Sequence, residues 1–274
     1  MSHAPKLARL EEILKGCSSA LVAFSGGLDS RFLVDACRRA GIEFQAVHFT
    51  GPHVTAAETA AASAWLTEQG ISFHLMRMDL LADEAIRRNS VERCYHCKRR
   101  LFLEARKLAD DLSLKHVLEG SQTSDLKAYR PGKTALIELD VKSPLAEAGL
   151  TKPDIRTAAK DLGLAGPEQP ARPCLLTRFD YGLPADGPML ARLAAIEDEL
   201  WRLGLKDFRL RIVSGANSLT QYYILQVAAV EREHFNACRR QIFAVLFRDG
   251  FHPVELVFSD KISGFFDHRQ GLLK

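Results

Sequence analysis

The feature that most constrains this chain is the stretch at residues 21–30, which reads Leu-Val-Ala-Phe-Ser-Gly-Gly-Leu-Asp-Ser. Its apolar half predicts a buried parallel strand, and a predicted helix follows through Ala40. Between them lies Ser25-Gly26-Gly27, where the missing Cβ atoms let backbone N–H groups turn toward a ligand. These donors and the positive end of the helix dipole predict an anion site, and we expect a phosphate group there.

The glycines of this stretch match neither of two common phosphate motifs. The Walker pattern needs a Lys-Ser/Thr pair after its glycines, and the dinucleotide fingerprint needs G-x-G-x-x-G. The stretch reads Ser-Gly-Gly-x-Asp-Ser and resembles the PP-loop ATP pyrophosphatases, which cleave ATP between its α- and β-phosphates. The resemblance implies that Asp29 helps to orient Mg²⁺ or the phosphates, since a hard dication prefers oxygen ligands. It also implies that four residues hold the pyrophosphate: Ser25, Gly26, Gly27 and Ser30. The alternative is a glycine turn that only caps a helix.

The composition bounds the class of protein. A chain of 274 residues with 47% hydrophobic and 26% charged residues is globular and long enough for one large domain plus a small one. A formal net charge of +3 is too small to indicate a nucleic-acid partner. We expect a cytoplasmic protein without a membrane partner, because no apolar run is long enough to span a bilayer and residues 1–15 lack the order of a signal peptide.

Strands and helices alternate in the first half of the chain. Predicted helices at 28–40 and 55–69 separate predicted strands, which lie at 21–24, 43–49, 71–76 and 115–118. This alternation predicts an α/β fold with a doubly wound, mostly parallel sheet, whose ligands bind at the carboxyl ends of the strands.

A polar loop at 119–132 follows the fourth predicted strand. Its hydroxyl, amide and carboxylate groups suit a nucleotide pocket, and the candidate ligands are Gly120, Ser121, Asp125 and Arg130. The alternative is a solvated turn rich in small polar residues.

The last third of the chain predicts a second domain. Helices are expected at 190–203 and 231–248, and strands at 208–213, 222–230 and 253–258. We therefore expect a PP-loop domain at 1–180 and a small α+β domain at 181–274, used for substrate or for contacts in a homo-oligomer.

The chain has six cysteines, which in a reducing compartment are thiols, ligands or nucleophiles rather than a disulfide framework. Cys94 and Cys97 form a C-x-x-C pair near a helix expected to begin around Cys97, where the helix dipole and neighbouring cations favour thiolates. The pair fits a redox couple, half of a zinc site completed by Cys174 and His96, or two ordinary thiols. Cys17, Cys37 and Cys238 fit no such spacing and are expected to be structural.

Cys174 lies in a segment that prolines keep out of a helix, so we expect an extended loop. Arg172 and Arg178 are near it in sequence, and cations stabilise a thiolate, which favours a nucleophile or a ligand. The alternative is an apolar cysteine that fills the core.

Four segments together resemble the LarE family, the ATP-dependent sulfurtransferases that help to build the nickel-pincer cofactor of lactate racemase. They are the motif at 25–30, Arg-Cys-Tyr-His-Cys-Lys at 93–98, the polar loop at 120–132, and Ser-Pro-Leu-Ala-Glu-Ala-Gly-Leu-Thr-Lys at 143–152. The resemblance covers the first two thirds of the chain. It weakens at 219–226 and 258–266, where the family's usual residues differ, so another carboxylate acceptor stays open.

The resemblance implies a two-stage reaction. ATP adenylates a carboxylate of pyridinium-3,5-biscarboxylic acid mononucleotide and releases pyrophosphate; sulfur then displaces AMP and leaves a thiocarboxylate. Family members with a lone cysteine at the Cys174 position give up its side-chain sulfur, whereas members with three cysteines look like cluster enzymes. This chain has all three, which implies that Cys94, Cys97 and Cys174 ligate three irons of a [4Fe-4S] cluster. The fourth iron would carry the sulfur, supplied by a donor protein or by free sulfide. The catalytic residues would then be these three cysteines and Asp29.

Two other functions compete with this interpretation. A PP-loop tRNA-thiolating enzyme would need a basic face, which 37 basic against 34 acidic residues do not favour. A non-catalytic relative, or an amidating one acting on a different acceptor, would use its cysteines for structure or for zinc.

Overall fold

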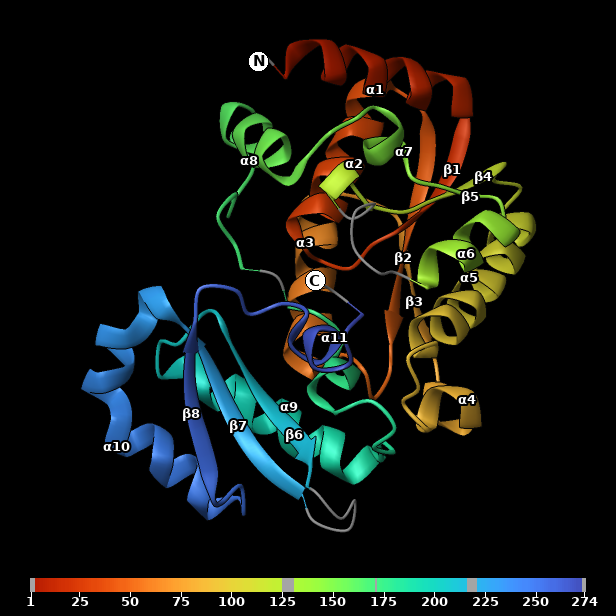
Figure 1. Cartoon of the computed structure of the whole chain (residues 1–274). Helices are drawn as coiled ribbons and strands as arrows, with labels where there is room; N and C mark the ends of the chain where they lie inside the picture. The colour runs from red at the N-terminus through yellow and green to blue at the C-terminus, as the bar shows by residue number, and fades with distance from the viewer. Residues whose placement is uncertain (1–2, 125–130, 171, 216–220, 273–274) are drawn as a thin grey trace. The chain divides into compact units, whose positions relative to one another are not determined.

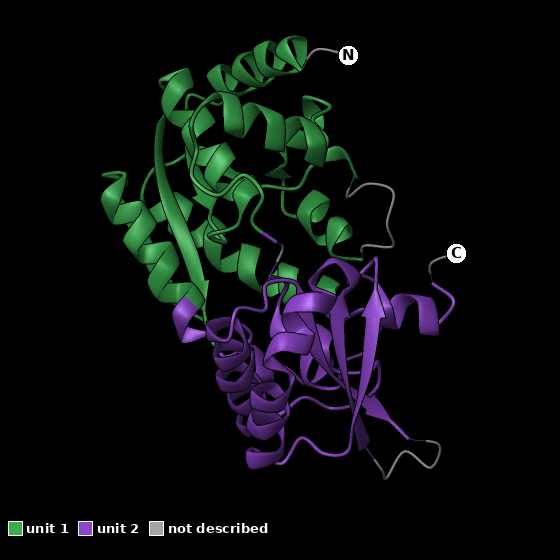
Figure 2. Ribbon diagram, turned by 90° about the vertical axis from the view of Figure 1, so that its left-hand side faces the viewer, with its two compact units in different colours: residues 1–51, 58–78, 94–169 green, residues 52–57, 79–93, 170–274 purple. Residues whose placement is uncertain are grey.

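The computed structural model describes residues 3–124, 131–170, 172–215 and 221–272, and its elements are labelled in Figure 1. The chain divides into two compact units (Figure 2). The first contains residues 1–51, 58–78 and 94–169, and the second contains residues 52–57, 79–93 and 170–274.

The first unit is built on a five-stranded parallel sheet with the strand order β3-β2-β1-β4-β5. This confirms the predicted α/β fold with a parallel sheet. The strands are β1 (Ser19–Ala23), β2 (Glu43–Thr50), β3 (Phe73–Arg77), β4 (His116–Leu118) and β5 (Val141–Lys142). The helices in this part of the chain are α1 (Ala4–Cys17), α2 (Leu28–Ala40), α3 (Ala56–Glu68), α5 (Arg93–Asp111), α6 (Gly132–Glu138), α7 (Pro144–Glu147) and α8 (Lys152–Asp161).

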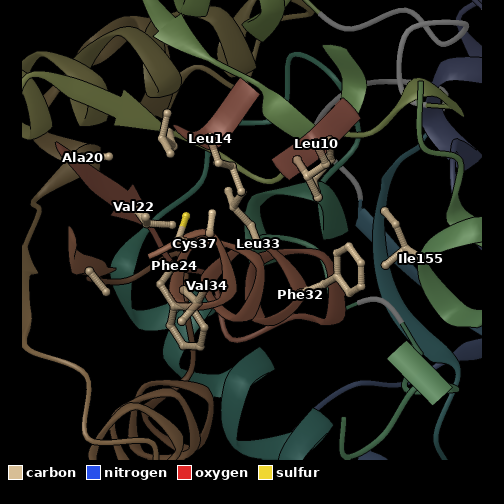
Figure 3. Packing of buried hydrophobic residues seen from close by; sticks show 14 of the residues in the cluster. Leu10, Leu14, Ala20, Val22, Phe24, Phe32, Leu33, Val34, Cys37 and Ile155 are labelled. Atoms are coloured by element: carbon tan, nitrogen blue, oxygen red, sulfur yellow. The ribbon is translucent and has the colours of Figure 1, made fainter. Parts of the chain in front are cut away.

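The central strand β1 is buried on both faces, which explains its continuous apolar sequence. Ala20, Val22 and Phe24 belong to one core cluster, together with residues of α1 and α2 (Figure 3), whereas Leu21 belongs to a second cluster that includes residues of α5. Side chains alternate between the faces of a strand, so each cluster takes every second residue. The sheet is therefore covered on both faces, as a doubly wound fold requires.

Two cysteines lie in the first of these clusters and confirm the prediction of a structural role. Cys17, at the end of α1, is 1% exposed, and Cys37, on α2, is fully buried (Figure 3). Burial raises the pKa of the Cys37 thiol to about 12, so this group stays a packed thiol.

The second unit contains a three-stranded sheet in the order β6-β7-β8, in which β6 and β7 are antiparallel and β7 and β8 are parallel. The strands are β6 (Phe208–Ser214), β7 (Gln221–Ala228) and β8 (Val254–Ser259). The helices are α4 (Glu84–Arg87), α9 (Gly187–Arg202), α10 (Arg232–Arg248) and α11 (Phe265–Arg269), with short 3₁₀ turns η1 (Leu80–Ala82), η3 (Leu175–Arg178) and η4 (Ala229–Glu231). The expected small α+β region is thus present.

The second unit draws two segments from the first half of the chain, residues 52–57 and 79–93, and it begins its long segment at residue 170. The amide of Asn89 shows why, since it donates to the carbonyls of Phe179 (3.2 Å) and Asp180 (2.7 Å). The domain division expected at residues 180 and 181 stays a prediction, because compactness does not establish which parts fold alone. Within the described residues, no helix combines the length and the hydropathy needed to cross a bilayer.

Candidate functional site

The predicted phosphate loop joins the carboxyl end of β1 to the first turn of α2. Gly27 is the N-cap residue of α2 and has no side chain with which to cap the helix, so N–H groups of the first turn are left for another acceptor. Gly26 has a φ of +76°, in the left-handed region that favours glycine. The local backbone therefore suits an anion at this helix N-terminus.

Two serine hydroxyls hold the loop in shape. The Ser30 hydroxyl donates to the Gly27 carbonyl at 3.0 Å and accepts from the Ser25 N–H at 3.2 Å. The two hydroxyl oxygens are 3.1 Å apart, and the Ser25 oxygen accepts from the Gly27 N–H at 3.3 Å. Ser30 is 3% exposed whereas Ser25 is exposed, so Ser30 supports the loop from within and Ser25 is open to a ligand.

Close packing accounts for two of the glycines. A Cβ atom on Gly26 would lie 3.3 Å from the Cβ of Ala62 on α3. A Cβ atom on Gly120, after β4, would lie 3.2 Å from the backbone nitrogen of Ser30. The structure thus brings Gly120 against the first turn of α2, beside the phosphate loop.

The buried carboxylate of Glu119 organises the polar loop that follows β4. It accepts hydrogen bonds from the Ser121 N–H (2.9 Å), the Ser121 hydroxyl (2.8 Å) and the Ser143 hydroxyl (2.5 Å). The ammonium group of Lys98, on α5, lies 3.4 Å from the same carboxylate. Glu119 and Ser143 were absent from the residues predicted for the site, because a single glutamate at a strand end carries no sequence signal of burial. Asp125 and Arg130, the other candidates in this loop, lie outside the described residues.

Lys152 is a site residue that the sequence analysis did not select. Its ammonium group donates to Asp29 at 2.7 Å, and both side chains are about three quarters buried, with exposures of 28% and 25%. Lys152 is in the first turn of α8, whose start is fixed by a capping box between Thr151 and Asp154. The Thr-x-x-Asp pattern around Lys152 was the signal that could have placed this ammonium group at a helix start.

The C-x-x-C pair lies in the first two turns of α5. The helix begins at Arg93, four residues before the expected start near Cys97, so that prediction was wrong. Arg93 is buried, and its guanidinium donates to the side chain of Asn89 and to the Leu176 carbonyl (2.9 Å), contacts that hold the chain at this point. Cys94 and Cys97, three residues apart on a helix, share a face and are half-buried.

The α6 helix packs closely against this turn. A Cβ atom on Gly132 would lie 2.8 Å from Cδ of Lys98 and 3.1 Å from the carbonyl oxygen of Cys94. Glycine at this position therefore allows α6 to approach the backbone that carries the cysteines.

Cys174 belongs to the second unit. It is half-buried, has extended ψ (135°) and immediately precedes the 3₁₀ turn η3, in agreement with the predicted location outside a helix. The Thr177 hydroxyl donates to the Cys174 carbonyl at 2.8 Å, and the Leu175 N–H donates to the His53 carbonyl at 3.0 Å. These two contacts fix the peptide between Cys174 and Leu175.

A buried ion pair supports the Cys174 loop. Arg178 donates to the two oxygens of Glu197, on α9, at 2.7 and 2.6 Å, and it also donates to the Pro173 carbonyl at 3.1 Å. Burial alone would raise the pKa of Glu197, but the Arg178 charge and its hydrogen bonds outweigh burial and lower it. Arg178 therefore holds the loop through the Pro173 carbonyl, and its charge is paired with Glu197. The predicted effect of Arg172 and Arg178 on the Cys174 thiolate stays a prediction.

Two further arginines lie on β6 and were not predicted as site residues. Arg211 donates to Gln226 Oε1 (2.7 Å) and to the carbonyls of Thr177 (3.0 Å) and Ile262 (2.7 Å), all neutral acceptors. Burial lowers the pKa of Arg211 to about 9 and that of Arg209 to about 10. Arg211 is thus a buried guanidinium bound to neutral acceptors beside the Cys174 loop, whereas Arg209 lies 3.5 Å from the Asp207 carboxylate.

The structure brings the predicted phosphate-loop residues, Gly120 and Ser121 together within one unit, while their role in binding ATP stays a prediction. Among the described residues, no group of three or more His, Cys, Asp or Glu side chains is gathered as metal ligands. Cys94 and Cys97 belong to the first unit and Cys174 to the second, so the meeting of the three thiols also stays a prediction. Thiolate sulfur is nevertheless the donor type that iron–sulfur clusters require.

Comparison with known proteins gave relatives that cover most of the chain. No family model matches the sequence. An uncharacterized protein of Synechocystis is 33% identical over 75% of this chain and 77% of its own length, and an uncharacterized protein of Methanocaldococcus jannaschii is 28% identical over 84% and 86%. The pyridinium-3,5-bisthiocarboxylic acid mononucleotide synthase of Lactiplantibacillus plantarum is 31% identical over 76% of both chains. Because the similarity to this synthase extends over three quarters of both chains, the chain belongs to the LarE family.

Proposed function

We propose that this protein is an ATP-dependent sulfurtransferase that adenylates a substrate carboxylate and then replaces AMP with sulfur. The proposed acceptor is pyridinium-3,5-biscarboxylic acid mononucleotide, the carboxylate counterpart of the product named for the L. plantarum relative. The observation that carries the proposal is the preorganised phosphate loop at the end of β1, with the Lys152 ammonium group bound to Asp29 beside it.

The first step forms an acyl adenylate. A carboxylate oxygen attacks the α-phosphorus of ATP, the bond from this phosphorus to the bridging β-oxygen breaks, and pyrophosphate leaves. Negative charge grows on the leaving pyrophosphate, so preorganised donors at its position lower the barrier. We assign this role to the N–H groups of the loop, to the exposed Ser25 hydroxyl and to the Lys152 ammonium group. Mg²⁺, held through Asp29, would supply further charge neutralisation when bound.

The second step transfers sulfur. A sulfur nucleophile attacks the acyl carbon, the bond from carbon to the phosphate oxygen breaks, and AMP leaves with that oxygen. A [4Fe-4S] cluster held by Cys94, Cys97 and Cys174 would supply the sulfur when bound. Thiolate sulfur is the donor type that such a cluster requires, and this chemistry supports the proposed ligand set.

The charge of the second unit supports an anionic acceptor. Arg211 is buried against neutral acceptors, whereas Arg178 is paired with Glu197 and Arg209 with Asp207. Buried cations are costly unless an anion compensates them. A substrate with carboxylate and phosphate groups would provide that compensation near Cys174.

The first test of this function identifies the two products that the protein forms from ATP. We expect AMP and pyrophosphate in the presence of the carboxylate substrate, measured by phosphorus NMR or by chromatography. The Gly26→Ala variant should lose this activity, because its φ of +76° is strained for alanine and the new Cβ would crowd Ala62.

Gly41→Ala is the matched control for this test. Gly41 ends the same helix with a φ of +68°, but a Cβ atom there meets nothing within 4 Å. The control should lose stability to a similar extent, about 1 kcal/mol, and keep the activity. ADP and phosphate as products, or equal loss of activity in both variants, would contradict the proposal.

A second prediction concerns Lys152. Replacing it with glutamine should lower the rate of AMP formation by about 100-fold, as expected when a charged donor to a leaving group is removed. Lys6→Gln is the control, because Lys6 pairs with Asp154 at the start of the same helix (2.6 Å) without contacting Asp29. The measurement is the steady-state rate of AMP formation by the two variants. Similar rates for Lys152→Gln and Lys6→Gln would mean that Lys152 only stabilises α8.

A further inference from the structure

His48 lies directly beneath the phosphate loop and takes no part in the chemistry described above. It is on β2, is 2% exposed and pairs with Leu75 of β3 in the sheet. It shares a face of β2 with Ala46, whose cluster also contains Phe24 and Ala62. His48 is therefore on the side of the sheet where Ala62 lies, the residue that a Cβ atom on Gly26 would approach to 3.3 Å.

The imidazole contacts the residue that begins the loop. His48 Nδ1 is 2.8 Å from the carbonyl oxygen of Phe24, immediately before Ser25. A carbonyl oxygen only accepts, so the proton of this hydrogen bond belongs to Nδ1. The last pair of the ladder between β1 and β2 is Ala23 with Val47, so the imidazole supplies a donor to Phe24 just beyond the point where β1 leaves the sheet.

The other groups of Phe24 are held as well. Its N–H donates to the Val47 carbonyl at 2.8 Å, and its ring stacks on Trp65 with centroids 5.2 Å apart. With the carbonyl bound to His48, the peptide plane between Phe24 and Ser25 is fixed. The direction in which the chain enters the phosphate loop therefore depends on the imidazole.

Packing alone does not account for a histidine at this position. The second ring nitrogen, Nε2, is buried and has no hydrogen-bond partner among the described residues. A buried nitrogen without a partner is destabilising, so an aliphatic side chain would serve the core better.

We propose that His48 is a positioning residue of the phosphate loop, which through Nδ1–H orients the peptide that leads into Ser25 and so presets the loop for pyrophosphate. This inference rests on the proposed function of the loop. It assigns to His48 no contact with the nucleotide and no proton transfer.

The experiment measures the affinity for Mg²⁺-pyrophosphate by calorimetry, together with the free energy of unfolding in urea. His48→Leu should weaken binding about tenfold, the effect of one lost hydrogen bond, without losing stability. His48→Asn should bind like the wild type, because the asparagine amide can place a donor where Nδ1 lies. His48→Gln places its donor farther out and should bind as weakly as leucine, which keeps the test usable if the leucine variant does not fold.

His74→Leu is the matched control. His74, on the neighbouring strand β3, contacts Gln45 through Nε2 at 2.8 Å and lies away from the loop, so its loss should leave pyrophosphate binding unchanged. Equal binding by the wild type and by His48→Leu would overturn the inference while leaving the proposed function intact. Absence of pyrophosphate binding by the wild type would instead overturn the proposed function.

Discussion

Replacing Cys94 with alanine is expected to abolish sulfur transfer and to remove the bound iron and acid-labile sulfide, while ATP is still cleaved to AMP. In the proposed ligand set each of three thiolates holds one iron, so the variant would leave two irons without a protein ligand. The phosphate loop is formed by β1 and α2, so adenylation should not depend on this thiol. Iron and sulfide per chain in anaerobically prepared protein, together with the visible absorbance, measure the effect.

Cys238→Ala provides the control for this prediction. Cys238 is a half-buried thiol on α10 that donates to the Leu203 carbonyl at 3.7 Å, and its loss should leave iron, sulfide and transfer unchanged. The Cys174→Ala variant completes the set and should also lose iron. Zinc without iron in the wild type would favour the amidating relative, and unchanged iron in Cys174→Ala would remove Cys174 from the ligands.

The largest expected effect on stability comes from Glu197. Replacing it with alanine should cost about 3–5 kcal/mol, because the Arg178 charge would stay buried without its partner. Urea unfolding measures the change. Glu199, two residues along the same helix, is the control: it also binds an arginine, Arg248, through two hydrogen bonds, but that pair is exposed. The Glu199→Ala variant should unfold at the same urea concentration as the wild type.

The pH dependence of this ion pair follows from the lowered pKa of Glu197. The carboxylate binds a proton less readily in the folded protein than in the unfolded chain, where its pKa is about 4.3. Its stabilising contribution is therefore complete above that pH and is lost as the pH falls through the lower, folded-state value. The difference in stability between the wild type and Glu197→Ala should shrink in acid; a difference that does not change with pH would contradict this assignment.

Local sequence patterns predicted most of the first unit. The apolar run before Ser25 and the glycines after it determine a strand, a turn and a helix start without reference to distant residues. The regular spacing of further strands and helices then leaves a parallel sheet as the consistent arrangement. The predicted phosphate-loop residues lie together for the same reason, since they are neighbours in the chain.

Features that depend on distant contacts were not predicted. The α5 helix begins at Arg93 because its side chain is bound by Asn89 and by the Leu176 carbonyl, 83 residues away. Arg209 and Arg211 alternate with apolar residues, a pattern typical of a strand with one exposed face, yet both are buried. The acceptors of Arg211 include Gln226 and the Ile262 carbonyl, and no local sequence pattern indicates such partners.

The central place of β1 in the sheet determines how stable the strand before the phosphate loop is. It is paired on both edges, with β2 and β4, and is buried on both faces. Amide hydrogens in such a strand exchange with solvent mainly through global unfolding, whereas strands at a sheet edge and helix ends exchange through local fluctuations. The entry to the phosphate loop is thus tied to the most cooperative part of its unit.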